Sequence, residues 1–235
     1  MKYERQMQLY EILKSKGSAT VGELAGLLYT SEASVRRDIA QLESSGLVTR
    51  VYGGVLLSNF KNSELPLGLR DIENSKEKEG LAKKAASYIN DGMTVILDSS
   101  STVRRIVKYI SHLKDVRIVT NSLSVVEDAK DLGFDVYCVG GIYNRKGNDL
   151  LGPSAEAYVS TISADICFFS AEAIDNDGEI TDISEERNSL RRAMMARAKR
   201  RVFLCDSSKL GMRRTFTLCK NTDVDDIICD VPLAF

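Results

Sequence analysis

The 235-residue sequence has few of the side chains that metal sites and disulfide frameworks require. It contains one histidine, His112, and five cysteines, none of which forms a C-x-x-C pair. We therefore expect mostly buried free thiols in a reducing compartment, with neither a metal site nor a disulfide framework.

Long apolar runs and glycine-rich nucleotide motifs are also missing. No apolar run approaches the roughly 20 residues of a membrane-spanning helix, and no signal peptide is recognised. We expect a cytoplasmic protein with no membrane partner. Neither G-x-G-x-x-G nor G-x-x-x-x-G-K occurs, and no cofactor is predicted.

The charge of the chain is nearly balanced, at −1 overall, so no general basic field attracts nucleic acid. Residues 1–59 hold seven basic and six acidic side chains, a local charge of +1 (7 minus 6). One copy therefore has few side chains to contact phosphates. If this segment binds DNA, we expect it to do so as a homodimer or homotetramer.

Residues 20–57 have the pattern of a helix, a tight turn, a second helix and a two-stranded wing. Thr20 and Glu23 form a capping box that begins the first of these helices. An amphipathic helix precedes them at 3–16. This order is typical of a winged helix-turn-helix, which places one helix in the major groove of DNA.

The second helix of the pair carries paired arginines. Val35, Ile39 and Leu42 share one face and are expected in the core, so Arg37 and Gln41 lie on the opposite face. The arginine pair alone also fits a solvated helix face, and the wing also fits a purely structural hairpin. With the whole pattern present, we expect DNA contacts from Ser31, Ser34, Arg36, Arg37, Gln41 and Arg50.

The run TSEASVRRDIAQLESSGLVTRVYGG resembles the signature of DeoR-family bacterial transcription regulators. Thr30 stands where the family usually has an apolar residue. The resemblance implies double-stranded operator DNA as a partner. The residues that fit the signature are Ser31, Glu32, Ser34, Val35, Arg36, Arg37, Asp38, Ile39, Leu42, Gly46, Arg50, Val51, Gly53 and Gly54.

The sequence predicts a DNA-binding domain at 1–57, a linker at 58–75 and a larger domain at 76–235. In the larger domain short apolar strands alternate with amphipathic helices, which predicts a mainly parallel α/β sheet covered on both faces. The strands are expected at 94–98, 116–120, 135–139, 166–170, 202–206 and 226–229. The helices are expected near 76–90, 102–113, 123–131, 154–160 and 185–199.

Small polar residues follow several of these strands, and ligands of parallel sheets bind beyond the carboxyl ends of strands. The first strand runs into Asp98 and the hydroxyl residues 99–102, and the second ends at Thr120 and Asn121. Hydroxyls and free amides at such loops suit an anion, although serine and threonine are also ordinary helix caps.

This half resembles the sensor domain of the same family, whose fold is related to phosphosugar isomerases. Ser100 replaces the family's usual glycine, and Ala171-Glu172-Ala173 departs from its glycine-rich spelling. The resemblance implies a phosphorylated sugar or related small anion as effector. The expected effector-binding residues are Asp98, Ser100, Ser101, Thr102, Thr120, Asn121, Gly140, Gly141, Arg145, Glu172 and Lys209.

Two other classes of protein compete with a regulator, which in this family is usually a repressor. A phosphosugar isomerase with an appended helical domain needs a positioned base, for which Glu172, Glu185 and Glu186 are candidates. The Glu185-Glu186-Arg187 segment is better explained as the start of a solvated helix, so no catalytic residue is predicted. The second class is an adaptor that binds only other proteins. Such a protein would have no need for the recognition-helix pattern.

Overall fold

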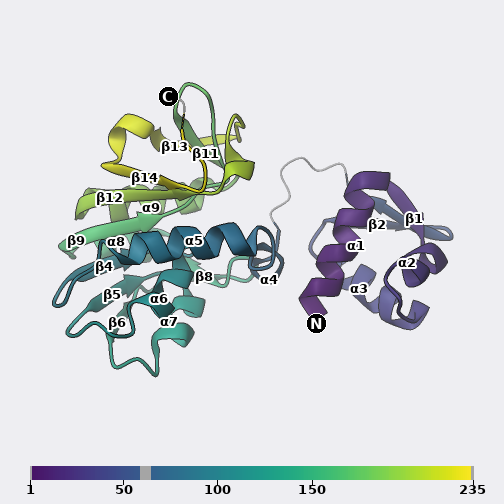
Figure 1. The fold of residues 1–235 in the computed structure, drawn as a ribbon, viewed down its shortest axis with the longest axis horizontal. Coiled ribbons are helices and arrows are strands. Elements are labelled where there is room, and N and C mark those ends of the chain that lie inside the picture. The colour runs from purple at the N-terminus through teal and green to yellow at the C-terminus, as the bar shows by residue number, and fades with distance from the viewer. Residues whose placement is uncertain (1, 59–64, 234–235) are drawn as a thin grey trace. The chain divides into compact units, whose positions relative to one another are not determined.

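The computed structural model describes residues 2–58 and 65–233, which form two compact units (Figure 1). The first unit extends to Glu73 and the second begins at Asn74. Each unit has its own hydrophobic core.

The first unit is a small helical domain with a three-stranded antiparallel sheet, as the winged helix-turn-helix pattern predicts. In the sheet β3 lies between β1 and β2. Strand β1 was not predicted, because three residues are too short to show an alternating pattern. The elements are α1 (Lys2–Lys16), β1 (Ser18–Thr20), α2 (Val21–Leu27), α3 (Glu32–Ser44), β2 (Val48–Val51), β3 (Gly54–Leu57) and α4 (Leu67–Arg70).

Local sequence signals set the helices of this unit. Thr20 caps α2 and forms the predicted capping box with Glu23. Val35, Ile39 and Leu42 of α3 are all buried in the core, as their spacing predicts. The opposite side of α3 is left facing outward.

Part of the segment expected as a linker packs onto the first unit. Leu69 of α4 is buried in its core, with Leu65 and Ile72 against the same cluster. These apolar side chains are shielded from water by packing on the first unit. The boundary between the two units therefore lies after Glu73, later than expected. Residues 59–64 of the expected linker lie outside the described residues.

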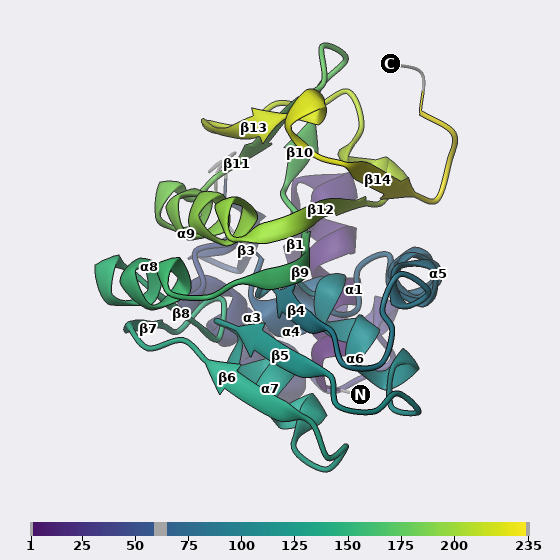
Figure 2. The same ribbon diagram turned by 90° about the vertical axis from the view of Figure 1, so that its left-hand side faces the viewer.

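The second unit is built on a six-stranded, fully parallel sheet, as predicted. Its order is β14-β12-β9-β4-β5-β6 (Figure 2). Because all six strands run the same way, their carboxyl ends meet at one edge of the sheet. The strands are β4 (Thr94–Leu97), β5 (Arg117–Thr120), β6 (Asp135–Cys138), β9 (Ala164–Phe169), β12 (Ala198–Cys205) and β14 (Asp226–Cys229).

Helices cover both faces of this sheet (Figure 2). Side chains of a strand alternate between faces: Val95 and Leu97 of β4 belong to one buried cluster, and Ile96 belongs to the other. Helices α5 (Ser75–Ala86), α6 (Ile106–Tyr109) and α7 (Leu123–Ala129) pack on the first cluster, and α8 (Pro153–Ser160) and α9 (Glu185–Ala196) on the second. The helix expected at 102–113 is shorter, with a 3₁₀ turn at Val103–Arg105 before α6.

Five short strands of the second unit were not predicted. Strands β7 (Ile142–Asn144) and β8 (Asp149–Leu151) form a hairpin. A small antiparallel sheet contains β10 (Ala173–Ile174), β11 (Glu179–Asp182) and β13 (Phe216–Lys220). Strands β7, β8 and β10 have only two or three residues, too few to show a pattern, and β11 and β13 hold polar residues among their apolar ones.

The cysteines are all free thiols, but they are less uniformly buried than expected. Cys167 and Cys205 are buried, whereas Cys138 is exposed at the end of the edge strand β6. Burial raises the pKa of the Cys205 and Cys219 thiols to about 12, so they carry no thiolate at neutral pH. Within the described ranges 2–58 and 65–233, no helix has the length and apolar character to cross a membrane.

Candidate functional site

Helix α3 is anchored at its N-cap and by α1. At its start the Ser31 hydroxyl accepts the backbone N–H of Ser34 at 3.3 Å. In its middle the buried carboxylate of Asp38 accepts from Arg5 Nε of α1 at 2.5 Å and from Gln6 Nε2 at 3.3 Å. The signature residue Asp38 therefore holds α3 against α1.

Arg37 lies on the exposed face of α3, as predicted. Its Nε donates to the Ala33 carbonyl at 3.4 Å, and its Nη2 donates to the Ser34 hydroxyl at 3.2 Å. Both acceptors are uncharged. Replacing such bonds with contacts to a base edge costs less than breaking a charged pair.

The other two arginines of α3 and the wing are paired with carboxylates. Arg36 Nη2 lies 3.0 Å from Glu32 Oε2, the predicted pair one turn apart. Arg50 donates to Glu43 through its backbone N–H at 3.1 Å and through Nε at 2.6 Å. These hydrogen bonds hold the pKa of the Glu43 carboxyl below its ordinary value.

Gln41 completes the predicted contact set on α3. It is exposed, and its side-chain oxygen accepts from the Gln6 amide of α1. The structure therefore brings Ser34, Arg37 and Gln41 to the outward side of one helix. DNA contact by these residues stays a prediction.

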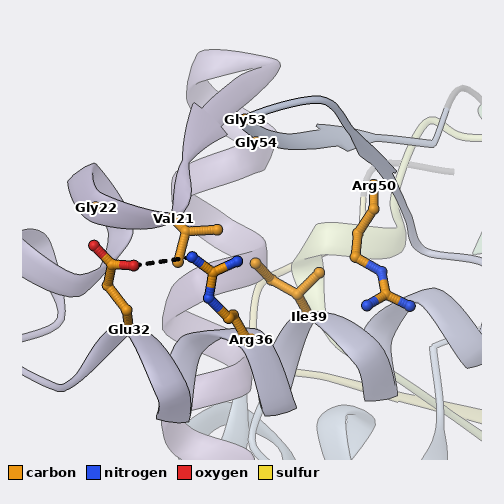
Figure 3. Close-up of a pocket in the computed structure, with 8 residues that line it drawn as sticks. All are labelled: Val21, Gly22, Glu32, Arg36, Ile39, Arg50, Gly53 and Gly54. Carbon is orange, nitrogen blue, oxygen red and sulfur yellow. Dashed lines mark hydrogen bonds and ion pairs between the residues drawn. The ribbon is translucent and has the colours of Figure 1, made fainter.

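A hollow of about 320 Å³ lies between α3, the start of α2 and the wing. Figure 3 shows Arg36 and Arg50 on opposite sides of Ile39, with Glu32 turned toward Arg36. Two guanidinium groups thus lie at one hollow beside α3. Its lining residues are Val21, Gly22, Glu32, Arg36, Ile39, Arg50, Gly53 and Gly54.

Each glycine of the wing is needed for a different reason. Gly53 has φ +81°, which the second position of this two-residue turn requires and which a side chain disfavours. At Gly54 a Cβ would lie 2.7 Å from the Ala19 carbonyl oxygen, because β3 approaches β1 closely there. Gly53 and Gly54 together fix the position of the wing relative to the start of α2.

In the second unit, Asp98 follows β4 and is buried in an ion-pair network. Its Oδ2 lies 2.9 Å from Arg191 Nε, and Arg191 Nη1 lies 2.6 Å from Asp182 Oδ2. Burial raises the pKa of Asp182, but the charge and hydrogen bond of Arg191 outweigh it, so this pKa lies below its ordinary value.

A second buried pair lies one helical turn away on α9. Arg187 Nε lies 2.9 Å from Asp149 Oδ2, which also accepts the Ser99 hydroxyl at 2.7 Å. The expectation that α9 begins as a solvated helix is therefore wrong at Arg187. The signal was present in the sequence, because Arg187 and Arg191 share the spacing of the apolar Leu190 and Met194.

Lys209 reaches the same edge of the sheet from the segment after β12. Its Nζ donates to the Ser170 hydroxyl at 3.0 Å and lies 3.8 Å from Asp206 Oδ2. Asp206 also accepts from Asn74 Nδ2 at 3.0 Å. The predicted cation is thus close to Asp98, because the backbone N–H of Ser170 donates to that carboxylate.

The hydroxyl loop after β4 is buried. The Ser100 hydroxyl accepts the Val103 N–H at 3.1 Å, and Ser101 and Thr102 are also shielded from solvent. Ser100 has a negative φ, so serine in place of the family's glycine causes no backbone strain. Thr120 is committed to structure too, because its hydroxyl donates to the Leu97 carbonyl and accepts the Ser122 N–H.

Asn121 presents a buried acceptor. Its amide donates to the Leu150 carbonyl at 3.3 Å, while its Oδ1 has no hydrogen-bond partner among the described residues. Asn121 and Asp98 border a narrow gap that has no room for a water molecule, together with Ser99, Arg187, Leu190, Arg191 and Met194. Two predicted effector residues and both unpredicted arginines therefore meet at one place.

The other predicted effector residues lie further out. Gly140 and Gly141 are exposed after β6, and Arg145 is exposed in the turn between β7 and β8. Glu172 is half-buried before β10. Among the described residues, Asp98 and Lys209 have their hydrogen bonds and ion pairs with other side chains and with the backbone, and none of these four takes part. Throughout the described part of the chain, no cluster of histidine, cysteine or acidic residues has the form of a metal site.

Both units match family profiles. Residues 5–60 match the DeoR-like helix-turn-helix domain, and residues 73–231 match the DeoR C-terminal sensor domain. The chain belongs to the DeoR family. The resemblance of the recognition helix and wing to this family is confirmed.

DeoR-family relatives that match most of the chain are transcriptional regulators. The regulator GolR of Listeria innocua is 30% identical over 97% of this chain and 90% of its own. The repressor CsqR of Escherichia coli is 31% identical over 87% and 78%, and the repressor GlcR of Bacillus subtilis is 30% identical over 97% and 88%. This chain is accordingly a DNA-binding transcriptional regulator and not an enzyme.

Solved structures match the α/β fold of the sensor domain. The delta subunit of eIF2B from Chaetomium thermophilum has a TM-score of 0.50 at 16% identity, over 71% of this chain and 62% of that one. Ribose 5-phosphate isomerase A from Methanocaldococcus jannaschii has a TM-score of 0.44 at 18% identity, over 58% and 55%. Neither likeness says anything about a ligand.

Proposed function

We propose that this chain is a sequence-specific repressor that inserts α3 into the major groove of its operator. Arg37 reads a base edge, with Ser31, Ser34 and Gln41 beside it, and Arg36 and Arg50 contact phosphates. The observation that carries the assignment is the contrast among the arginines. Arg37 donates only to uncharged acceptors, whereas Arg36 and Arg50 are held by glutamates.

In this proposal the protein binds DNA as a homodimer or homotetramer, with two copies of α3 on the operator. One α3 offers a single freely available arginine among the described residues of helix and wing, which gives few contacts to DNA. Two recognition helices on adjacent half-sites gain affinity because the second contact becomes intramolecular. Several relatives carry the name of repressor, which supports repression over activation.

The effector in this proposal is a phosphorylated sugar or related anion at the carboxyl edge of the parallel sheet. Asn121 offers a buried acceptor suited to a sugar hydroxyl, and Lys209 offers a cation. Arg187 and Arg191 are already neutralised by Asp149, Asp98 and Asp182. A phosphate that approaches them must therefore displace a carboxylate, and that exchange changes the packing of α9.

The effector assignment is tested on protein bound to a duplex that it selects. Phosphorylated sugars are added one at a time, and one of them should release the DNA, whereas its unphosphorylated form and inorganic phosphate should not. A double variant, Thr102→Val with Lys209→Met, should bind DNA without effector near the wild-type level and lose the response. Lys220→Met, an exposed lysine of β13, is the control.

Two results would contradict the effector assignment. One is that no phosphorylated sugar changes DNA binding. The other is that the double variant releases DNA at the wild-type effector concentration, which would move the pocket elsewhere.

A further inference from the structure

Two tyrosines of the first unit stand free of its core. Tyr29 is 97% exposed in the turn between α2 and α3, and Tyr52 is fully exposed at the tip of the wing. Single exposed aromatic residues are common on protein surfaces. Exposure alone therefore does not assign them a role.

The backbone of Tyr29 makes its presence harder to explain by folding. Its φ is +48°, in the left-handed region that glycine and asparagine adopt most easily. A bulky residue there is disfavoured, and this one gains no burial in return. A residue that costs stability and packs on nothing suggests a role outside the fold.

Both tyrosines lie beside the recognition helix. Tyr29 is two residues before Ser31, the N-cap of α3, and Tyr52 is two residues after Arg50. Glu32 at the start of α3 and Gly53 at the wing tip line the same hollow (Figure 3). The first residue of α3 and the wing tip therefore border the same hollow.

We propose that Tyr29 and Tyr52 bind the DNA backbone, with each phenol hydroxyl donating a hydrogen bond to a phosphodiester oxygen next to the groove that α3 enters. This inference rests on the proposed DNA contact of α3. Tyrosine hydroxyls are regular phosphate donors in protein–DNA complexes. They suit this domain in particular, because glutamates hold Arg36 and Arg50 and neutral donors face no such competition.

The test measures affinity of the full chain for two labelled duplexes at one salt concentration. One duplex is selected by the protein, and the other has an unrelated sequence. Tyr29→Phe and Tyr52→Phe remove only the hydroxyl, so each should lose about two- to tenfold in affinity on both duplexes alike. Tyr158→Phe on α8 of the sensor domain is the control and should match wild type.

Tyr29→Gly separates a binding role from a structural one. Glycine accepts positive φ, so this variant should unfold at a higher temperature than wild type while losing DNA affinity at least as much as Tyr29→Phe. A structural role predicts that the melting temperature and the affinity fall together.

Phenylalanine variants that bind both duplexes within the error of wild type would overturn the inference and leave the proposed function standing. Loss confined to the selected duplex would also overturn it, because phosphate contacts carry no sequence information. Wild-type protein that binds neither duplex would overturn the proposed function, and this inference with it.

Discussion

The Arg5 guanidinium of α1 donates to the Asp38 carboxylate of α3 at 2.5 Å. Asp38 is buried in the middle of the recognition helix, where an unpaired carboxylate is costly. The pair with Arg5 offsets that cost and fixes the rotation of α3 about its axis. In that orientation Ile39 points toward the core and Arg37 points toward solvent.

Replacing Asp38 with alanine should lower the free energy of unfolding of the first unit by about 1–3 kcal/mol, because Arg5 and Gln6 lose their shared acceptor. Urea titration of the full chain measures the loss. Glu32→Ala, which removes the exposed pair with Arg36, should cost less than about 0.5 kcal/mol. Equal losses would show that Asp38 does not anchor the helix.

Arg50 and Glu43 should have opposite effects on DNA binding. Arg50→Ala removes a phosphate contact, so affinity should fall on all sequences and the salt slope should shrink by about 1. Glu43→Gln frees Arg50 from its carboxylate partner and should strengthen binding to all sequences.

The control for Arg50 is Arg213→Ala in the sensor domain, a side chain of almost the same exposure (59% against 58%). The DNA affinity of each variant is measured by titration at several salt concentrations. An Arg50 variant with unchanged salt dependence would exclude a phosphate contact by that residue.

Neighbouring arginines of α9 should differ sharply in their effect on stability. Arg191→Met leaves Asp98 and Asp182 buried without their cation and should lower the free energy of unfolding by about 3–5 kcal/mol at neutral pH. Arg192→Met removes an exposed pair with Glu185 and should cost about 1 kcal/mol or less. Thermal or urea unfolding distinguishes them, and similar losses would contradict the buried network.

The sensor domain should lose stability on acidification. Burial raises the pKa of Asp206, but Lys209 and hydrogen bonds from Ser208 and Asn74 outweigh it, and its pKa lies below the ordinary value, as does that of Asp182. A depressed pKa in the folded state gives stability that is present above the unfolded value, near 3.9, and is lost as the pH falls through the folded value.

Urea midpoints of the sensor domain should therefore hold steady from about pH 7 to 5 and fall below about pH 4. Asp182→Asn should reduce the fall, because one of the titrating groups is gone. A sensor domain that becomes more stable between pH 5 and 3 would contradict these ion pairs.

Regular elements were predictable because their signals are local. The capping box at Thr20 and the spacing of Val35, Ile39 and Leu42 lie within a few residues, and each buried parallel strand is an apolar run. The short strands β10 and β11 have no such signal, because β10 has only two residues and β11 is mostly polar.

The polar core of the sensor site could not be derived in this way. Arg191 pairs with Asp98, 93 positions earlier in the chain, and only the folded sheet brings them together. The spacing of Arg187 and Arg191 puts them on the apolar face of α9, but their carboxylate partners lie far away in the sequence, and the acidic start of the helix favoured the wrong environment for Arg187. The hydroxyls after β4 were placed at the correct edge, but their burial depends on packing that no local pattern shows.

Selection of duplexes from a random DNA pool tests sequence-specific binding through α3 most directly. Wild-type protein should enrich a defined motif with two related half-sites, and Arg37→Ala should lose preference at one base of each half-site, at a cost of ~1–3 kcal/mol on the selected duplex. Enrichment of no motif by wild type, or the same motif with undiminished affinity from Arg37→Ala, would contradict the reading of DNA by this helix.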